Sequence, residues 1–212
     1  GVSDGFNALR GKLPKWTLII HLAALPYFPE EKVAYEEEDL KGVCGEMGLP
    51  LAQTVAGEEG LEATLLDLML QPWLALKKAH FKGSFHPVTL FTVLKRASEF
   101  EKAISALAQE YGYPPADIGG YMLPVERGRN CYMEFDFHCD LADPADVERV
   151  KALWLSANEL CANMGAVLAK PYGPCADIIY SRVQAPYVEL LRKWKNAIDP
   201  NNIMNPGQLC FY

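Results

Sequence analysis

The stretch Cys131-Tyr132-Met133-Glu134-Phe135-Asp136-Phe137-His138-Cys139-Asp140 has the clearest period-two alternation in the chain. Its odd positions are apolar, and its even positions carry a tyrosine, three acids and a histidine. Because successive side chains of a strand point to opposite faces of a sheet, this pattern predicts a strand with one apolar and one polar face. Five polar side chains on one face are unusual for a surface packed into a dry core.

The segments around this strand predict a compact βαββαβ order. Residues 118–125 form the hairpin partner of the strand, with a turn at 127–130. Asp143-Pro144 begins a helix that runs to Met164, with Gly165 after its end. The remaining predicted elements are a strand over 84–94, a helix over 99–111 with Ser98 as its N-cap, and a short strand over 166–169.

The first part of the chain predicts a second, smaller set of elements. They are a strand over 16–24, a helix over 30–47, a strand over 51–55, and an insert over 57–83 that contains a helix over 61–70. Helices would then cover one face of a mostly antiparallel sheet, which is an α+β, ferredoxin-like arrangement. The expected divisions are a linker over 1–15, a main domain over 16–183, and a C-terminal helix and tail over 184–212.

Composition excludes several classes of function. The chain has 212 residues, a net charge of −7 and half of its residues hydrophobic. It lacks the basic stripe of a nucleic-acid-binding protein and the run of about 20 apolar residues of a membrane span. None of the six cysteines forms a C-x-x-C pair, so no metal site is expected, and without a signal peptide we expect buried thiols in a cytoplasmic protein.

The polar face of the 131–140 strand offers the first candidate site. Glu134, Asp136 and His138 stand at alternating positions and could converge on one ion or one proton. A solvated face of a half-exposed sheet explains the same pattern. A third interpretation is a polar wall over a ligand pocket.

Two basic positions outside this strand could hold an anion. Lys170 follows a short apolar strand and precedes Pro171-Tyr172-Gly173, so a rigid backbone could present it to an anionic group; a surface lysine is the alternative. Arg127 and Arg129 flank Gly128 in the hairpin turn, where a carboxylate clamp and a solvated turn are both open.

The C-terminal stretch carries a more specific pattern than any of these candidates. It reads Lys-x-x-x-Asp-Pro-Asn-x-Ile-x-x-Pro-Gly, in which the fixed positions are Lys195, Asp199, Pro200, Asn201, Ile203, Pro206 and Gly207. This pattern resembles the closing motif of FAD-linked oxidases of the vanillyl-alcohol oxidase and p-cresol methylhydroxylase type.

The resemblance implies that the chain is the substrate-binding cap domain of an FAD-dependent oxidoreductase. Residues 184–212 would return to an FAD-binding domain, with Asn205, Pro206 and Gly207 as cofactor contacts. That domain would be N-terminal to the cap or on another chain. The implied substrate is an alcohol or a phenolic or anionic small molecule, and residues 1–212 alone would be inactive.

The resemblance also assigns residues to the substrate. Residues 165–177 are similar to a family stretch in which a tyrosine and an arginine bind a phenolate oxygen. Lys170 falls at the arginine position and Tyr172 at a histidine position, whereas Ala169 stands where the tyrosine is expected. An anionic oxygen is therefore favoured over a phenol. Arg129 and Asn130 fall near a histidine pair that lines the family's active site.

Two other functions remain as alternatives. One is the cap domain of a 2-hydroxy-acid dehydrogenase of the glycolate or lactate type, although residues 131–140 lack the histidine-rich pattern of that group. The other is a non-catalytic ferredoxin-like binding module. A homodimer is compatible with each of these functions.

Overall fold

The computed structural model describes residues 10–55, 57–71, 73, 78–79, 81–170 and 172–211. Residues 1–9 of the predicted linker over 1–15 therefore lie outside the described residues. The chain divides into two compact units, Gly1–Leu76 and Lys77–Tyr212, and each is described by itself below.

The second unit is built on a four-stranded antiparallel sheet. Its strands are β1 (Gly83–Thr92), β2 (Ile118–Val125), β3 (Asn130–Asp140) and β4 (Val167–Leu168). Their spatial order is β2-β3-β1-β4, and every neighbouring pair is antiparallel. The predicted α+β fold with an antiparallel sheet is confirmed, and β2 has the predicted bounds.

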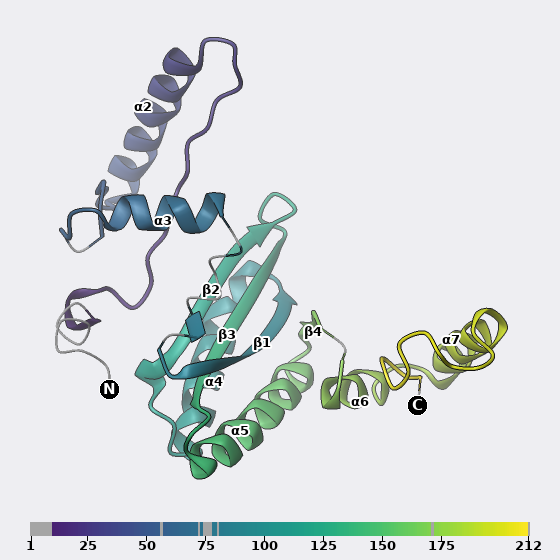
Figure 1. The fold of residues 1–212 in the computed structure, drawn as a ribbon. Helices are drawn as coiled ribbons and strands as arrows, with labels where there is room; N and C mark the ends of the chain where they lie inside the picture. Colours follow the sequence, from purple (N-terminus) through teal and green to yellow (C-terminus); the bar gives the residue numbers. More distant parts are fainter. Residues whose placement is uncertain are drawn as a thin grey trace. The chain divides into compact units, whose positions relative to one another are not determined.

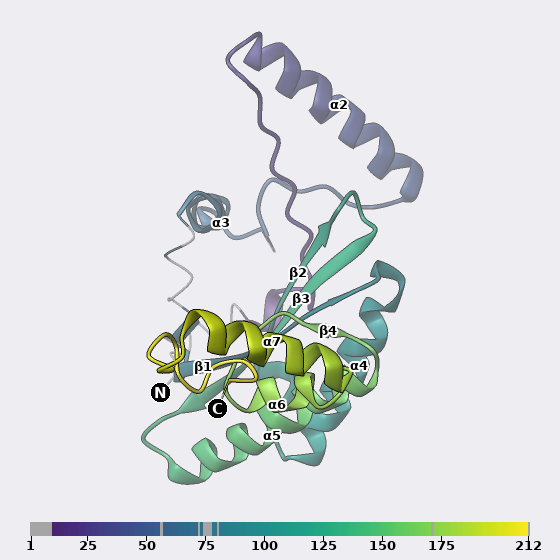
Figure 2. The same ribbon diagram turned by 90° about the vertical axis from the view of Figure 1, so that its right-hand side faces the viewer.

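Two helices, α4 (Ala97–Glu110) and α5 (Pro144–Asn163), lie together against one face of this sheet (Figures 1 and 2). The side chains between these helices and the sheet are almost completely shielded from solvent. Its fully buried members with less than 2% exposure include Val88, Leu90, Phe100, Ile104, Met133, Phe137, Val150 and Leu153. Burying apolar area of this kind is the main force that holds the layer together.

Local signals place the ends of these helices. Asp143 caps α5, because its side chain accepts a hydrogen bond of 2.9 Å from the N–H of Ala145. Gly165 follows α5 with a φ of 84°, which a residue with a side chain rarely adopts. The prediction of Ser98 as the cap of α4 is wrong: the N-cap residue is Arg96, because a 3₁₀ turn, η2 (Leu94–Arg96), leads directly into the helix.

The strand register assigns every side chain of the sheet to one of two faces. Val88 pairs with Phe135 and points toward the helices, whereas Thr89 pairs with Glu134 and points away from them. We call the face opposite α4 and α5 the open face. Gly119 of β2 pairs with Asp136 on it. A short 3₁₀ turn, η3 (Pro115–Asp117), leads into β2.

The chain continues beyond β4 into two further helices. The helix α6 (Pro174–Tyr180) was not expected from the sequence, and it contacts α5. The helix α7 (Ala185–Ile198) is strongly amphipathic, and none of its residues is buried. It is the helix that the sequence predicts at the start of the segment 184–212.

The first unit contains the helices α2 (Pro29–Met47) and α3 (Leu61–Leu70), both as predicted. The predicted strands over 16–24 and 51–55 are wrong, because neither segment pairs with another strand among the described residues and residues 53–55 form a bend. Apolar content identified them as strands, but a strand also requires a partner for its backbone N–H and C=O groups.

Two further sequence expectations can be compared with the structure. All six cysteines are free and buried, as expected. Within the part of the chain that the structure describes, no helix is long and apolar enough to cross a membrane.

Candidate functional site

A network of charged side chains lies on the open face around β3. The Lys78 Nζ donates to Glu134 Oε1 at 2.6 Å and to Asp136 Oδ2 at 2.8 Å. The Tyr132 hydroxyl donates to the second oxygen of Glu134 at 2.8 Å. One ammonium group therefore bridges two carboxylates that the strand period places on the same face.

Burial makes this network electrostatically strong. Asp136 is 2% exposed, and its desolvation, together with the nearby Glu134 charge, raises the pKa of Asp136 to about 6. Burial also acts against ionised Glu134, but hydrogen bonds from Lys78 and Tyr132 outweigh it and lower the pKa of Glu134. The two carboxylates thus differ: Glu134 stays ionised, and Asp136 can take up a proton near neutral pH.

His138 continues the network along the strand. It is 7% exposed, and the ring of Phe81 meets its ring edge-on with 5.0 Å between the centroids. Burial and the nearby Lys82 charge lower the pKa of His138, so its ring is neutral at pH 7. Lys82 itself donates to Asp117 at 2.8 Å.

Two buried polar atoms of this cluster have no hydrogen-bond partner among the described residues. They are Asp136 Oδ1 and His138 Nδ1. Both side chains lie over Gly119, because a Cβ on that glycine would stand 3.3 Å from Asp136 Oδ2 and from His138 Nε2. A glycine on β2 therefore allows the close approach of these two side chains to the neighbouring strand.

The open face changes character along the strands. Toward the β2–β3 turn it carries large side chains that are exposed, with values of 47% for Tyr121, 45% for Leu123 and 38% for Phe91. A cavity of about 500 Å³ at the end of the sheet is lined partly by Phe91, Val167 and Asn130. The face thus combines a buried charged end with an exposed apolar end.

The predicted residues of the hairpin turn are separate from this network. Asn130 donates to Glu126 at 2.7 Å, and Arg129 is exposed. Six residues of strand separate Asn130 from Asp136, which corresponds to about 20 Å. Their assignment to the substrate stays a prediction, and the structure brings together only Glu134, Asp136 and His138.

Lys170 and Tyr172 follow β4. Lys170 is exposed, and its carbonyl accepts a 3.0 Å hydrogen bond from the N–H of Tyr172. Tyr172 is half exposed and lines a cavity with residues of α7 and the tail. Their role in substrate binding stays a prediction as well.

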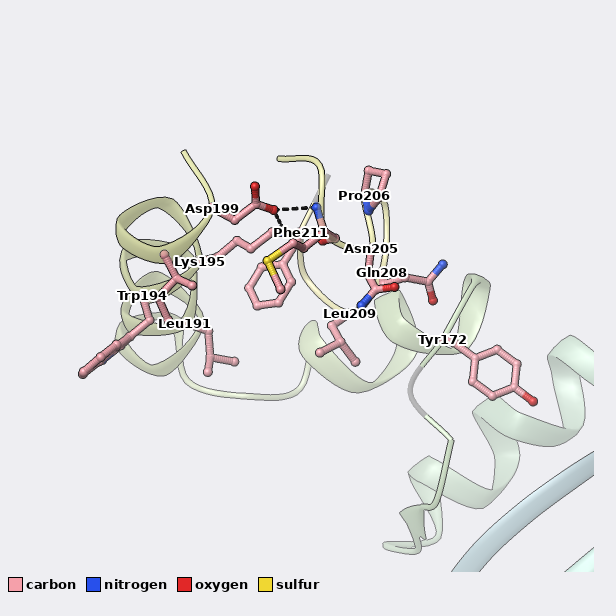
Figure 3. Close-up of a pocket in the computed structure, with 12 residues that line it drawn as sticks. Tyr172, Leu191, Trp194, Lys195, Asp199, Asn205, Pro206, Gln208, Leu209 and Phe211 are labelled. Atoms are coloured by element: carbon pink, nitrogen blue, oxygen red, sulfur yellow. Dashed lines mark hydrogen bonds and ion pairs between the residues drawn. The ribbon is translucent and has the colours of Figure 1, made fainter. Parts of the chain in front are cut away.

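The tail motif forms a clasp at the end of α7, shown in Figure 3. Asp199 accepts hydrogen bonds from the N–H groups of Ile203 at 3.0 Å and Met204 at 2.8 Å. Lys195 pairs with Asp199 and also donates to the carbonyl of Met204. The lysine and the aspartate of the motif therefore fix the turn that follows the helix.

A cavity of about 860 Å³ lies between α7 and this tail. Trp194, Pro206, Leu209 and Phe211 give it an apolar lining, to which Asn205 and Gln208 add polar amide groups. Gly207 follows in the turn with a φ of 72°.

The tail fits only part of an FAD molecule. Its apolar wall and two amides suit the edge of a flat ring system. A diphosphate requires cations or free N–H groups, yet Lys195 is already paired with Asp199, and the N–H of Gly207 donates to Phe211 at 2.9 Å. Cofactor contacts by Asn205, Pro206 and Gly207 stay a prediction, limited to the ring.

A metal site has no support in this geometry. Among the described residues, no group of three or more histidine, cysteine, aspartate or glutamate side chains is arranged to hold a metal ion. Lys78 occupies the position between Glu134 and Asp136 that a cation would take.

Sequence reasoning missed two members of the network. Lys78 lies 56 residues before Glu134 and outside every recognised motif, so only the fold brings the two together. Gly119 lies inside the predicted strand over 118–125. A glycine inside a predicted strand signals a close approach by a neighbour, and this signal could have found it.

Comparison with known families identifies the C-terminal half of the second unit. Residues 132–209 match the family described as FAD linked oxidases, C-terminal domain. The predicted resemblance to FAD-linked oxidases is therefore confirmed over this part of the chain. A search of curated protein sequences found no match.

Solved structures with the same fold include two enzymes of this type. A substrate-bound structure of p-cresol methylhydroxylase matches 86% of the chain with a TM-score of 0.68 and 16% identity. An isoeugenol complex of 4-ethylphenol oxidase from Gulosibacter chungangensis matches 87% with a TM-score of 0.62 and 16% identity. The chain spans 36% and 38% of the lengths of these two proteins.

Proposed function

We propose that the chain is the substrate-binding cap domain of an FAD-dependent oxidoreductase that acts on an alcohol. The flavin would be held mainly by a domain outside residues 1–212, either N-terminal to the cap or on another chain. The family match over 132–209 and the fold shared with two oxidising enzymes support this assignment.

The observation that carries the proposal is the open face of the sheet. Among the described residues, α4 and α5 cover only the opposite face, and the open face holds Glu134, Asp136 and His138 beside exposed apolar side chains. A mainly apolar surface with a few convergent polar groups of shifted pKa is typical of ligand sites. This face would form the roof of the substrate pocket.

The chemistry of the reaction would come from the flavin, which accepts a hydride from the bound substrate. The cap would orient the substrate and exclude water from it. Tail residues Asn205 and Pro206 would contact the ring edge. Lys170, Tyr172, Arg129 and Asn130 are proposed as outer contacts of the substrate, because they fall at or near substrate-binding positions of the family that the sequence resembles.

Anaerobic reduction of the flavin tests this function. The flavoprotein that contains this chain would be mixed with benzyl alcohol, 4-ethylphenol and lactate in turn, and the loss of flavin absorbance would be followed. Rapid bleaching by the alcohol supports the proposal. Bleaching by lactate alone would support the 2-hydroxy-acid alternative, and no bleaching by any of the three would refute both.

A second experiment examines the chain by itself. Residues 1–212 would be titrated with FAD, and binding would be measured from the quenching of flavin fluorescence. We expect no tight complex and no turnover, because the tail lacks a free cationic group for the diphosphate. A stoichiometric complex would contradict the assignment of the flavin to another domain.

A further inference from the structure

The buried end of the open face has unused hydrogen-bonding capacity of a defined kind. Asp136 Oδ1 can only accept a hydrogen bond while the carboxyl group is ionised. The Nδ1 of a neutral His138 ring either donates or accepts, according to its tautomer. Since buried polar groups are nearly always paired, two such atoms on adjacent positions of one face indicate a missing partner.

The charges around these atoms determine what that partner can be. From the segment before β1, Lys78 is shared by Glu134 and Asp136, and Lys82 is paired with Asp117. Tyr132 on β3 and Tyr121 on β2 lie on the same face and contact each other. Lys78 and Lys82, the described cations beside the pair, are thus already balanced by carboxylates, so an added anion would meet repulsion.

We propose that Asp136 and His138 form a subsite for the neutral hydroxyl group of an amphiphilic alcohol, and that this subsite rejects phenolates and carboxylates. A hydroxyl group both donates and accepts, so it complements a carboxylate oxygen and an imidazole nitrogen together. Gly119 is the third member of the subsite, because it leaves room for both side chains.

The apolar part of the ligand has a place on the same face. Tyr121 and Phe91 are exposed on either side of Tyr132, on the two strands that flank β3. Each contacts the Tyr132 ring edge-on, with centroid separations of 6.1 Å and 5.4 Å. Tyr121 lies opposite Glu134, the neighbour of Asp136 on this face, so an aromatic or aliphatic body on the Tyr121 ring would direct its hydroxyl group toward Asp136.

This inference rests on the proposed function, since it names the substrate class of the proposed pocket. It also replaces the expectation of an anionic substrate oxygen, which the sequence had attached to Lys170. Among the described residues, Lys78 and Lys82 beside the open face are paired with carboxylates, whereas Lys170 is exposed beyond β4.

Binding of three matched probes to residues 1–212 tests the subsite without the flavin. The probes are benzyl alcohol, its methyl ether, which cannot donate a hydrogen bond, and benzoate, which is an anion. Isotope-edited NMR would follow the amide signals of Gly119 and His138 and the carboxyl carbon of Asp136. We expect saturable shifts with the alcohol, and at least tenfold weaker binding of both the ether and benzoate.

The NMR signal of the Asp136 carboxyl carbon distinguishes a hydrogen bond to the ligand from a purely structural role of this residue. A hydroxyl group that donates to ionised Asp136 stabilises the charged form, so the alcohol should lower the titration midpoint of this carboxyl group. The ether should leave the midpoint unchanged. Binding of the alcohol and the ether with equal affinity, or tighter binding of benzoate, would overturn the proposal.

Three variants complete the experiment. Asp136→Asn keeps the shape of the side chain but removes the anionic acceptor, and we expect at least a tenfold loss of alcohol binding. Gly119→Ala should have the same effect, because its Cβ would stand 3.1 Å from Asp136 Cβ. Asp140→Asn removes the same charge from an exposed position of the same strand and should bind like the parent chain.

The results separate this inference from the proposed function. Flavin reduction by alcohols with no contribution of Asp136 to probe binding would refute the subsite and leave the function intact. Selective alcohol binding to residues 1–212 without flavin reduction in the whole protein would refute the proposed function and leave the subsite intact. If Gly119→Ala fails to fold, Asp136→Asn with its Asp140→Asn control still decides the question.

Discussion

The sheet layer and the C-terminal tail of the second unit are stabilised in different ways. The sheet and the helices α4 and α5 enclose a continuous core in which Phe100, Leu90 and Phe137 are fully buried. The helix α7 has no buried residue, and its Trp194 is 62% exposed. The tail keeps its conformation through polar contacts of a few residues around Asp199.

The apolar core of the layer makes the domain fold, whereas the motif in the tail makes the family resemblance recognisable. The layer owes its stability to apolar volume, which many sequences can supply. The tail carries the family motif, and its exposed apolar side chains are placed by a small clasp. Exposed apolar side chains held in this way are what the proposed function requires of a surface that meets the flavin domain.

The largest expected effect compares an aromatic residue of each region. Phe137→Ala should lower the free energy of unfolding by about 3–5 kcal/mol, because it opens a cavity beside Tyr113, whose ring lies 5.6 Å away. Trp194→Ala should cost less than about 0.5 kcal/mol, as exposed positions usually do. Urea unfolding followed by circular dichroism measures both, and equal losses would contradict the contrast drawn here.

The next effect concerns pH and the buried Asp136. Its pKa rises from 3.8 to about 6 in the folded chain, so the folded state favours the protonated form. The stability that this group contributes is complete below about pH 4 and is lost as the pH rises through about 6. The difference in unfolding free energy between the parent chain and Asp136→Asn should therefore fall by about 2 kcal/mol from pH 4.5 to 7.

Glu134 and His138 titrate in the opposite sense, which is why the variant is needed. Both have a lowered pKa, so each contributes stability that is lost as the pH falls. Subtracting the unfolding free energy of Asp136→Asn from that of the parent chain at each pH removes the contribution of Glu134 and His138 to first order. A difference that stays flat from pH 4.5 to 7 would show that Asp136 is ionised throughout this range.

The sequence predicted most of the second unit because its patterns are local. Period-two alternation identified β3, and helical spacing after an Asp-Pro cap identified α5. The first unit was harder, because apolar content alone does not say whether a strand finds a partner. The segment 16–24 is apolar, yet Leu18 is 77% exposed and unpaired within the described residues.

The sequence could predict only those site residues that lie on one strand, β3. Glu134, Asp136 and His138 follow from the period of β3, and the structure brings them together. Lys78 and Gly119 complete the network through tertiary contacts that no local pattern encodes. The expectation of an anion-binding lysine at position 170 came from the rigid backbone around it and from the family resemblance, and it has no counterpart in this network.

A smaller effect tests the cap of α5. Asp143→Ala removes the acceptor for the N–H of Ala145 and should cost about 1 kcal/mol of unfolding free energy. Asp143→Ser keeps a capping oxygen and should recover most of that loss. Chemical denaturation of the three proteins gives the comparison, and a serine variant as unstable as the alanine variant would exclude a capping role.

The smallest effect on global stability is expected at the clasp of the tail. Asp199→Ala removes the acceptor for the N–H groups of Ile203 and Met204 and the partner of Lys195, so both amides should exchange with solvent at least tenfold faster. The midpoint of urea unfolding should not change, because the clasp supports no core. Hydrogen bonds from Lys195 and from these two amides lower the pKa of Asp199, so acid should open the clasp only below about pH 4. Unfolding of the whole second unit on this substitution would show instead that the tail and the sheet layer form one cooperative structure.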